Sequence, residues 1–335
     1  GYRPHPGARA LSGKSTNPGT SLVWAIDLGG TNTKLGIVAA GGEVIGQDSI
    51  PTKPERSGQS WADEVAAALR AVGERERVDE AALLGVGIGA PGPLSAKDGV
   101  LTNPLPNLPK WRRFPICAAL SERLGKPAFL DNDANVAALA EQWLGAAKGS
   151  DNVVVLTLGT GIGGGVIAEG RLLHGFSDNA GELGHITIDH DGPECACGNR
   201  GCIELYASAA AIVQRFRRKL TEAGRKAEDE ITAEEVFDAA EAGDELAKAT
   251  FSEVGYCLGV AVGGLVHAFN PELVVVAGGV ARASRHFLGT IRSVVKERTF
   301  TDLQAGLRIE ASPLGDGMGL LGAARLALLA AGGKR

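Results

Sequence analysis

Four potential metal ligands lie close together in the sequence: His185, Cys195, Cys197 and Cys202. Three thiolates and one imidazole are soft ligands that can form a tetrahedral shell around Zn²⁺. The same stretch carries Glu182 and Glu204, two carboxylates that zinc does not need. A metal that folds a loop beside spare polar groups suggests a loop that presents those groups to a ligand.

A further set of polar side chains lies where a strand-like segment meets a helix-like one, in the run Asp131-Asn132-Asp133. One of them could simply cap the helix by accepting from its first N–H groups. Three polar groups exceed what a cap requires. A carboxylate here can accept the proton of a hydroxyl while a neighbouring amide holds the same substrate, which is the task of a general base in phosphoryl transfer to an alcohol.

Two glycine-rich turns, residues 29–33 and 159–164, each follow a strand-like segment. Glycine lets backbone N–H groups approach an anion closely, and threonine hydroxyls add donors. Tight hairpins alone would need the same glycines, but matching turns in two halves of the chain favour two cradles for the two ends of a triphosphate chain. Neither turn matches the Walker or the dinucleotide pattern. Asp27, before the first turn, could hold Mg²⁺ through water.

The composition limits the class of protein. The chain has 335 residues, of which 44% are hydrophobic and 22% charged, as in globular proteins with room for two domains. The net charge of −5 and the lack of a long basic block argue against a nucleic-acid partner. No run of about 18 apolar residues predicts a membrane span. Five cysteines, three of them in the metal-like stretch, suit a reducing cytoplasm.

The elements that position these groups alternate between strands and helices, which predicts an α/β protein. Residues 1–21 lack the apolar core of a signal peptide and are expected to form a disordered leader. A strand, a glycine turn and a second strand occur twice, which suggests a duplicated core with a cleft between two lobes. We expect strands at 22–27, 34–40, 43–49, 83–89, 128–130, 152–158, 165–169 and 273–277, and helices at 61–74, 134–147, 204–220, after the capping box at 232–235, 244–269 and 317–329.

Taken together, these motifs resemble the ROK family of sugar kinases and related repressors, in the actin-like ATPase superfamily. The resemblance runs from about Leu22 to the C-terminus. It rests on residues 27–34, 89–93, 132–135, 158–164, 181–185, 195–202 with Glu204, and 277–279. It implies a duplicated ribonuclease-H-like core with an interlobe cleft, a small lobe of residues 22–131 plus about 318–335, and a large lobe of residues 132–317 with a zinc loop at 181–204.

The resemblance also implies roles for individual residues. Asp133 would be the base that activates the sugar 6-hydroxyl. His185 would bind a structural zinc ion with Cys195, Cys197 and Cys202, and its second ring nitrogen could then face the sugar. The other sugar-binding residues would be Asn132, Glu182, His185, Glu204, Asn103 and Gly92. The ATP-binding and phosphate-binding residues would be Asp27, Gly29, Gly30, Thr31, Asn32, Thr33, Lys34, Thr160, Gly161, Gly163 and Gly279.

Within the family the sequence favours a glucokinase that uses ATP and Mg²⁺, because the segment 181–185 and the complete zinc loop are typical of that group. Asn179 departs from the commonest pattern, which leaves N-acetylglucosamine, N-acetylmannosamine, mannose and fructose as alternative substrates. A sugar-sensing repressor would need a helix-turn-helix domain of roughly 60 residues, and about 21 residues precede the first predicted strand. We expect a cytoplasmic homodimer or homotetramer.

Overall fold

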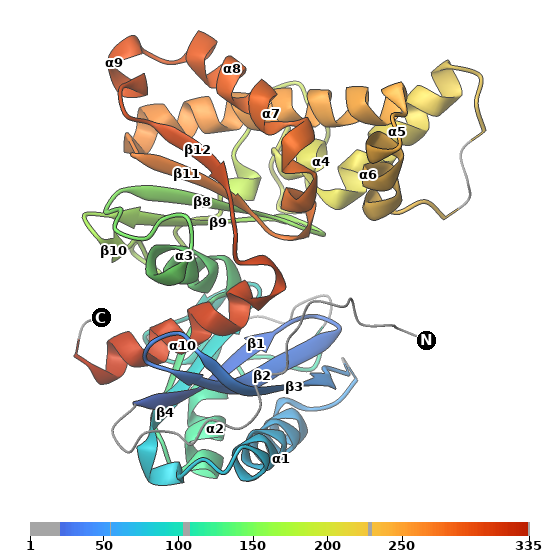
Figure 1. The fold of residues 1–335 in the computed structure, drawn as a ribbon. Helices are drawn as coiled ribbons and strands as arrows, with labels where there is room; N and C mark the ends of the chain where they lie inside the picture. Colours follow the sequence, from blue (N-terminus) through green and yellow to red (C-terminus); the bar gives the residue numbers. More distant parts are fainter. Residues whose placement is uncertain (1–20, 54, 103–107, 227–229, 334–335) are drawn as a thin grey trace.

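The chain folds into two five-stranded sheets with helices on both faces of each (Figure 1). The computed structural model describes residues 21–53, 55–102, 108–226 and 230–333. The first sheet has the order β3-β2-β1-β4-β7, with β1 (Leu22–Leu28), β2 (Asn32–Ala39), β3 (Val44–Pro51), β4 (Leu83–Ala90) and β7 (Ala128–Asn132). The second has the order β10-β9-β8-β11-β12, with β8 (Val153–Leu158), β9 (Ile162–Ala168), β10 (Arg171–Leu172), β11 (Leu273–Ala277) and β12 (Arg308–Ala311).

The two sheets have the same topology. In the first, β1 pairs antiparallel with β2 and parallel with β4, and β4 pairs parallel with β7. In the second, β8 pairs antiparallel with β9 and parallel with β11, and β11 pairs parallel with β12. Each glycine turn therefore connects the first two strands of one sheet. This symmetry confirms the predicted duplicated α/β core.

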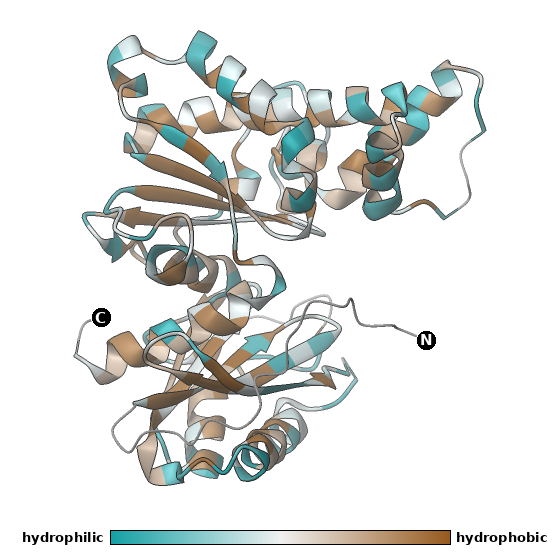
Figure 2. Cartoon of the chain, in the orientation of Figure 1, coloured by the Kyte–Doolittle hydropathy of each residue, from teal (hydrophilic) through white to brown (hydrophobic). Residues whose placement is uncertain are grey.

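Side chains alternate between the two faces of each strand, as the period of a β-strand requires. In the first sheet, Trp24 and Ile26 pack with the outer helices α1 (Gly58–Arg75) and α2 (Ile116–Leu124), whereas Val23 and Ala25 pack with α10 (Met318–Ala331). The inner strands β1, β8 and β11 and the helix α10 are dominated by hydrophobic residues, whereas β3, β12 and α1 carry both kinds (Figure 2). The inner strands β1, β4, β8 and β11 are thus buried on both faces, whereas the edge strand β3 is largely exposed.

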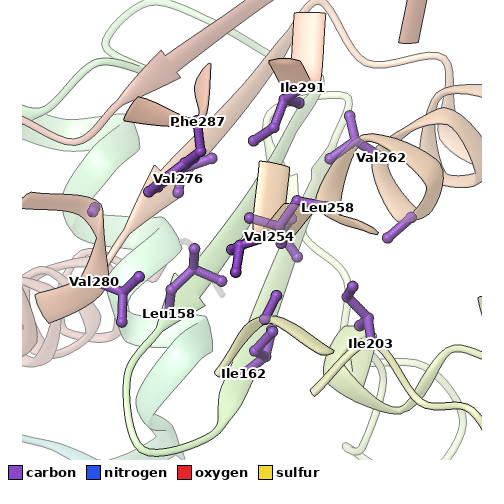
Figure 3. Packing of buried hydrophobic residues seen from close by; sticks show 14 of the residues in the cluster. Leu158, Ile162, Ile203, Val254, Leu258, Val262, Val276, Val280, Phe287 and Ile291 are labelled. Carbon is purple, nitrogen blue, oxygen red and sulfur yellow. The ribbon is translucent and has the colours of Figure 1, made fainter. Parts of the chain in front are cut away.

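The outer face of the second sheet packs on α7 (Glu245–Phe269), and Leu158 and Val276 from the strands meet Val254 and Leu258 from the helix (Figure 3). α7 is long and apolar enough to cross a membrane, but 61% of its most hydropathic window is buried in the protein, as in a core helix. It packs against α4 (Glu204–Ala207), α5 (Ala209–Glu222), α6 (Ala233–Glu241) and α8 (Leu288–Arg298), and the short α9 (Thr301–Gln304) follows α8.

The two lobes exchange a helix at their junction. α3 (Asp133–Leu144) follows the last strand of the first sheet but packs on β8 and β9, while α10 follows the last strand of the second sheet but packs on β1 and β4. The contacts are close enough to require glycine. A Cβ at Gly87 would lie 1.7 Å from the carbonyl oxygen of Ala323, and one at Gly322 would lie 1.8 Å from that of Val136.

Most predicted elements occur within a few residues of their expected bounds, and one helix was predicted wrongly. The single helix expected at 204–220 is two helices, α4 and α5. Ser208 separates them with φ −70° and ψ 168°, and its hydroxyl accepts a hydrogen bond from Ala211 N. Ser208 is therefore the N-cap of a new helix. The predicted capping box is present, since Thr232 and Glu235 each accept a hydrogen bond from the other's backbone N–H.

Candidate active site

A cavity of about 540 Å³ lies where the two glycine turns, the start of α3 and residues 181–204 meet. We call residues 181–204, which carry the four potential metal ligands, the metal-like loop. The cavity is lined from both lobes, because its wall includes Gly30 and Gly92 as well as Glu182 and Glu204. The residues that the sequence singles out and that line this cavity are Gly30, Thr31, Gly92, Asn132, Asp133, Thr160, Gly161, Gly163, Glu182, His185, Glu204 and Gly279. We call it the cleft.

Five of the predicted phosphate-site residues do not line the cleft: Asp27, Gly29, Asn32, Thr33 and Lys34. Thr33 requires a correction. Its side chain is fully buried, and its hydroxyl bonds to the Thr52 hydroxyl at 3.0 Å and accepts from the Trp61 indole N–H at 3.0 Å. This hydroxyl fastens the turn to α1 and is not available to a phosphate. Asn103, a predicted sugar contact, lies outside the described residues.

The first turn owes its shape to backbone hydrogen bonds around Gly29. Gly29 N donates to Asn32 O at 3.0 Å, and a Cβ at Gly29 would lie 2.7 Å from that same oxygen. The Thr52 hydroxyl donates to Gly29 O at 2.7 Å. Lys34 Nζ donates to the carbonyl oxygen of Asp316 at 3.2 Å and so bonds to the segment before α10. The turn is a hydrogen-bonded hairpin that presents Gly30 and Thr31 to the cleft.

Asp133 is the first residue of α3, and Asn132 is its N-cap. The Asn132 side-chain oxygen accepts from Ala134 N at 2.8 Å and Asn135 N at 3.3 Å. The cap uses only this oxygen, so the amide nitrogen keeps two hydrogens that it can donate to a ligand. The helix therefore fixes a carboxylate and an amide side by side at one point of the cleft.

The Asp133 side chain reaches water in the cleft, but protein surrounds it on its other sides. Burial is the largest cause that raises its pKa; the Ala134 N–H lowers it, the carboxylates of Asp27 and Glu182 raise it, and the net pKa is about 6. Burial also raises the pKa of Asp27, and the Lys34 ammonium opposes that shift. Asp133 thus combines exposure to the cleft with a pKa close to neutral pH, as general bases require.

The second turn is bonded to Glu204, the first residue of α4. Glu204 Oε2 accepts from Ile162 N at 2.9 Å. A Cβ at Gly161 would lie 2.4 Å from this oxygen and would displace the carboxylate from its present position. Gly159 N donates to Gly161 O at 2.9 Å and closes the turn. The second turn and the metal-like loop are consequently one connected unit.

The four potential metal ligands converge in space. One ligand atom from each of His185, Cys195, Cys197 and Cys202 lies within 4.8 Å of all the others. Cys197 Sγ and Cys202 Sγ are 3.7 Å apart, and Cys195 Sγ is 3.6 Å from His185 Nδ1. Bonds of about 2.3 Å at a tetrahedral angle around zinc would put two sulfurs about 3.8 Å apart. The donor set and its spacing therefore fit Zn²⁺.

His185 connects this cluster to the cleft. Its Nδ1 faces Cys195, and its Nε2 lies 4.0 Å from a carboxylate oxygen of Glu182. The loop backbone is held independently, since Asn199 Nδ2 donates to His185 O at 3.1 Å and Cys195 N donates to Asn199 O at 2.8 Å. Burial among the neighbouring thiols raises the pKa of Cys202 to about 12, so a bound metal would have to displace its proton.

A second cavity of about 230 Å³ adjoins the cleft, with which it shares Gly159, Thr160 and Gly279. Phe237 and Phe251 form part of its wall. No short segment of the sequence indicates this pocket, because its lining comes from helices that are far apart along the chain. Thr157 and Asp178, which line the cleft, were not predicted from the sequence, and Asn179 was noted only as a departure from the family pattern.

Comparison with known proteins identifies the family of this chain. The ROK family model matches residues 23–330. The chain is 38% identical to the glucokinase of Thermotoga maritima, over 90% of this chain and 95% of that protein. It is 34% identical to the xylose repressor of Caldicellulosiruptor bescii, over 72% of this chain but 61% of that protein. A crystal structure of a ROK family glucokinase from Streptomyces griseus with glucose and AMPPNP is similar, with a TM-score of 0.79, 32% identity, and coverage of 92% of this chain and 99% of that one. The chain belongs to the ROK family.

Proposed function

We propose that this protein is an ATP-dependent hexose kinase whose substrate is D-glucose and whose products are ADP and D-glucose 6-phosphate. One observation carries the proposal. The cleft brings a carboxylate with a raised pKa, Asp133, together with the polar side chains of Asn132, Glu182, His185 and Glu204 and with two glycine turns. The glucokinase relatives, which match over nearly their whole length, support a phosphotransferase that acts on a sugar hydroxyl.

In the proposed reaction, Asp133 accepts the proton of the sugar 6-hydroxyl. The oxygen then forms a bond to the terminal phosphorus of ATP while the bond between that phosphorus and the bridging oxygen breaks, and ADP leaves. With a pKa of about 6, most Asp133 is ionised at pH 7 and ready to accept a proton. Asn132, Glu182, His185 and Glu204 would hold the other hydroxyls, together with the predicted contacts at Gly92 and Asn103.

We propose that the two glycine turns bind the phosphates of ATP. Gly30 and Thr31 of the first turn and Thr160, Gly161 and Gly163 of the second line the cleft. The pocket with Phe237 and Phe251 is apolar and adjoins the second turn, which suits a nucleoside base. Asp27 would hold Mg²⁺ through water, and its carboxylate is one of the charges that raise the pKa of Asp133.

We propose that the cluster of His185, Cys195, Cys197 and Cys202 holds a structural zinc ion. With four protein ligands, zinc has no open position and would act by ordering the loop. His185 and Glu182 face the cleft from the start of that loop. The loop would therefore be rigid where the sugar binds.

A kinase for another hexose remains the main alternative, because sugars that differ by one hydroxyl or an acetamide group are distinguished by individual hydrogen bonds. A sugar-sensing repressor is less favoured, because two glucokinase relatives match at 36–38% identity over 92–95% of their own length, whereas the xylose repressors match over 60–82% of theirs. One coupled assay separates these functions. It would test glucose, N-acetylglucosamine, N-acetylmannosamine, mannose and fructose, each with ATP and with polyphosphate. Glucose with ATP should have the highest kcat/KM.

Two further expectations concern the assembly and its location. We expect a homodimer or homotetramer in the cytoplasm, as the sequence analysis does. Light scattering during size-exclusion chromatography would test the assembly, and a monomer at working concentrations would contradict it. Fractionation of the source cells would test the location.

A further inference from the structure

The segment that leads to Glu182, which we call the 173–182 loop, is anchored at its first turn by His174. It connects β10 to the short helix η2 (Leu183–His185). Ala180 N donates to the carbonyl oxygen of His174 at 3.0 Å, which closes the loop just before Gly181 and Glu182. The side chain of His174 points across to the other lobe, where its Nε2 lies 2.7 Å from Asp131 Oδ2.

Asp131 is the last buried residue before the base, with 1% of its surface exposed. Its Oδ1 accepts from Asn132 N at 2.8 Å and from Asn135 Nδ2 at 2.8 Å. These two residues flank Asp133 on the first turn of α3. The Asp131 carboxylate therefore bonds to His174 through Oδ2, and through Oδ1 it bonds to Asn132 and Asn135, which flank the proposed base Asp133.

We propose that His174 is a positioning residue. Through its hydrogen bond to Asp131 it fixes the 173–182 loop, which carries Glu182, relative to the start of α3, which carries Asp133. The proposal rests on the proposed kinase function. A ring N–H from His174 satisfies an oxygen that is otherwise buried. Without this donor, the carboxylate pays the cost of an unsatisfied buried oxygen and is free to shift. A shift of Asp131 moves Asn132 and Asn135, and with them Asp133, relative to Glu182.

Two features of the surroundings make the pair testable without unfolding the protein. The loop has a second anchor to the first lobe, since Asp178 Oδ2 accepts from Lys97 N at 3.1 Å. In addition, His174 and Asp131 line a cavity of about 950 Å³ that also includes Arg171 and Arg325. Removal of the imidazole would leave space that connects with this cavity, so free imidazole can enter and take its place.

The test compares the wild-type protein with His174→Ala, His174→Gln and a matched control, His267→Ala, which removes an exposed histidine of α7 outside the cleft. For His174→Ala we expect kcat/KM for glucose to fall about 10- to 100-fold, as misplacement of a catalytic group does. The KM for ATP should stay within about twofold of the wild-type value, because the ATP contacts are unchanged. Free imidazole should restore turnover with saturation.

His174→Gln keeps an N–H donor at the distance of Nε2 and should lie close to the wild-type rate, as should His267→Ala. Wild-type kinetics in His174→Ala would overturn the proposal. So would a glutamine variant as slow as the alanine variant, with no recovery in imidazole. If His174→Ala does not fold, His174→Gln is compared with His174→Asn, whose shorter side chain cannot reach Asp131. Equal activity of these two variants would then overturn the proposal.

Failure of the kinase proposal itself has a different signature, because the wild-type protein would then phosphorylate no hexose. In that case hydrogen exchange, which needs no turnover, measures whether His174 holds the 173–182 loop and the start of α3 together. Backbone amides of residues 131–135 and 180–182 should exchange faster in His174→Ala than in the wild type. Unchanged exchange in both segments would refute the positioning role.

Discussion

Glu204 accepts a hydrogen bond from the backbone N–H of Ile162 at 2.9 Å. One carboxylate thus joins the metal-like loop to the second glycine turn, and both line the cleft. If Glu204 also binds the sugar, as we propose, its replacement should weaken the binding of both sugar and nucleotide. Replacement of a residue that contacts only the sugar should leave nucleotide binding unchanged.

This relationship predicts a difference between two substitutions of Glu204. Glu204→Ala loses the turn contact and the proposed sugar contact, so the KM values for glucose and for ATP should both rise, by about tenfold or more. Glu204→Gln keeps an oxygen that can accept from Ile162 N, so the KM for ATP should stay near the wild-type value while that for glucose rises. Steady-state kinetics with each substrate varied in turn measures this. Equal effects of the two substitutions on ATP would contradict the structural role.

Asp133→Asn tests the base. Loss of a general base lowers turnover by about 10²- to 10⁴-fold, while glucose binding, measured by calorimetry, should persist. A variant that kept more than about a tenth of wild-type kcat would contradict the assignment, given the size of general-base effects.

The same variant carries its own control for folding. Burial raises the pKa of Asp133, so ionised Asp133 destabilises the folded state at pH values above its unfolded pKa. A neutral asparagine removes that cost. The melting temperature of Asp133→Asn at pH 7.5 should therefore equal or exceed that of the wild type, and a large drop would mean that lost turnover reflects lost structure.

The pKa of Asp133 also sets the pH dependence of the reaction. Protonated Asp133 cannot accept a proton, so kcat/KM for glucose should decline as the pH falls through about 6, by about tenfold for each further pH unit. An aspartate with an ordinary pKa would keep its activity to a much lower pH. A pH–rate profile with saturating ATP measures the midpoint. A flat profile between pH 5 and pH 7 would rule out Asp133 as the titrating base.

Cys197→Ser tests the link between metal and sugar. Cys197 is the exposed cysteine of the cluster, so its replacement removes a ligand without opening the core. The variant should lose its zinc, and its KM for glucose should rise about 10- to 100-fold, as when the groups that orient a site are lost. Cys117→Ser, in α2 and outside the cluster, is the matched control and should keep both properties. Elemental analysis that finds no zinc in the wild type would contradict the link.

Thr33→Val tests the correction made by the structure. Valine has the shape of threonine but leaves the Trp61 indole N–H without its acceptor, which should lower the free energy of unfolding by about 1–3 kcal/mol. The KM for ATP should not change. Thr31→Val is the comparison, because Thr31 is exposed and lines the cleft. That variant should raise the KM for ATP without loss of stability. The reverse outcome would restore Thr33 to the phosphate site.

Most of the fold could be predicted because its signals are local. The alternation of strand-like with helix-like segments, the capping box at Thr232 and the repeated glycine turn are all visible in short segments of the sequence. The break between α4 and α5 was missed although serine is favoured at N-caps over helix interiors, because the alanines on both sides of Ser208 are strong helix formers. The exchange of α3 and α10 between lobes depends on close contacts at Gly87 and Gly322 with residues distant in the chain.

The grouping of side chains was predictable where one short motif supplies several of them, as with Asn132 and Asp133 in the cleft or the three cysteines beside His185. It was not predictable where the decisive contact is made by a distant residue. Nothing near Thr33 in the sequence indicates that Trp61 uses its hydroxyl, and nothing near Asp131 indicates that His174 bonds to it. The pocket lined by Phe237 and Phe251 could not be predicted for the same reason, because its lining residues are distant from one another in the sequence.

A crystal structure with glucose and a non-hydrolysable ATP analogue tests the central claim most directly. The account predicts that the sugar 6-hydroxyl lies within hydrogen-bond distance of an Asp133 carboxylate oxygen, with the terminal phosphate beyond it and Glu182, His185 and Glu204 on the other hydroxyls. A sugar bound in the cleft with its 6-hydroxyl directed away from Asp133, or bound outside the cleft, would contradict it.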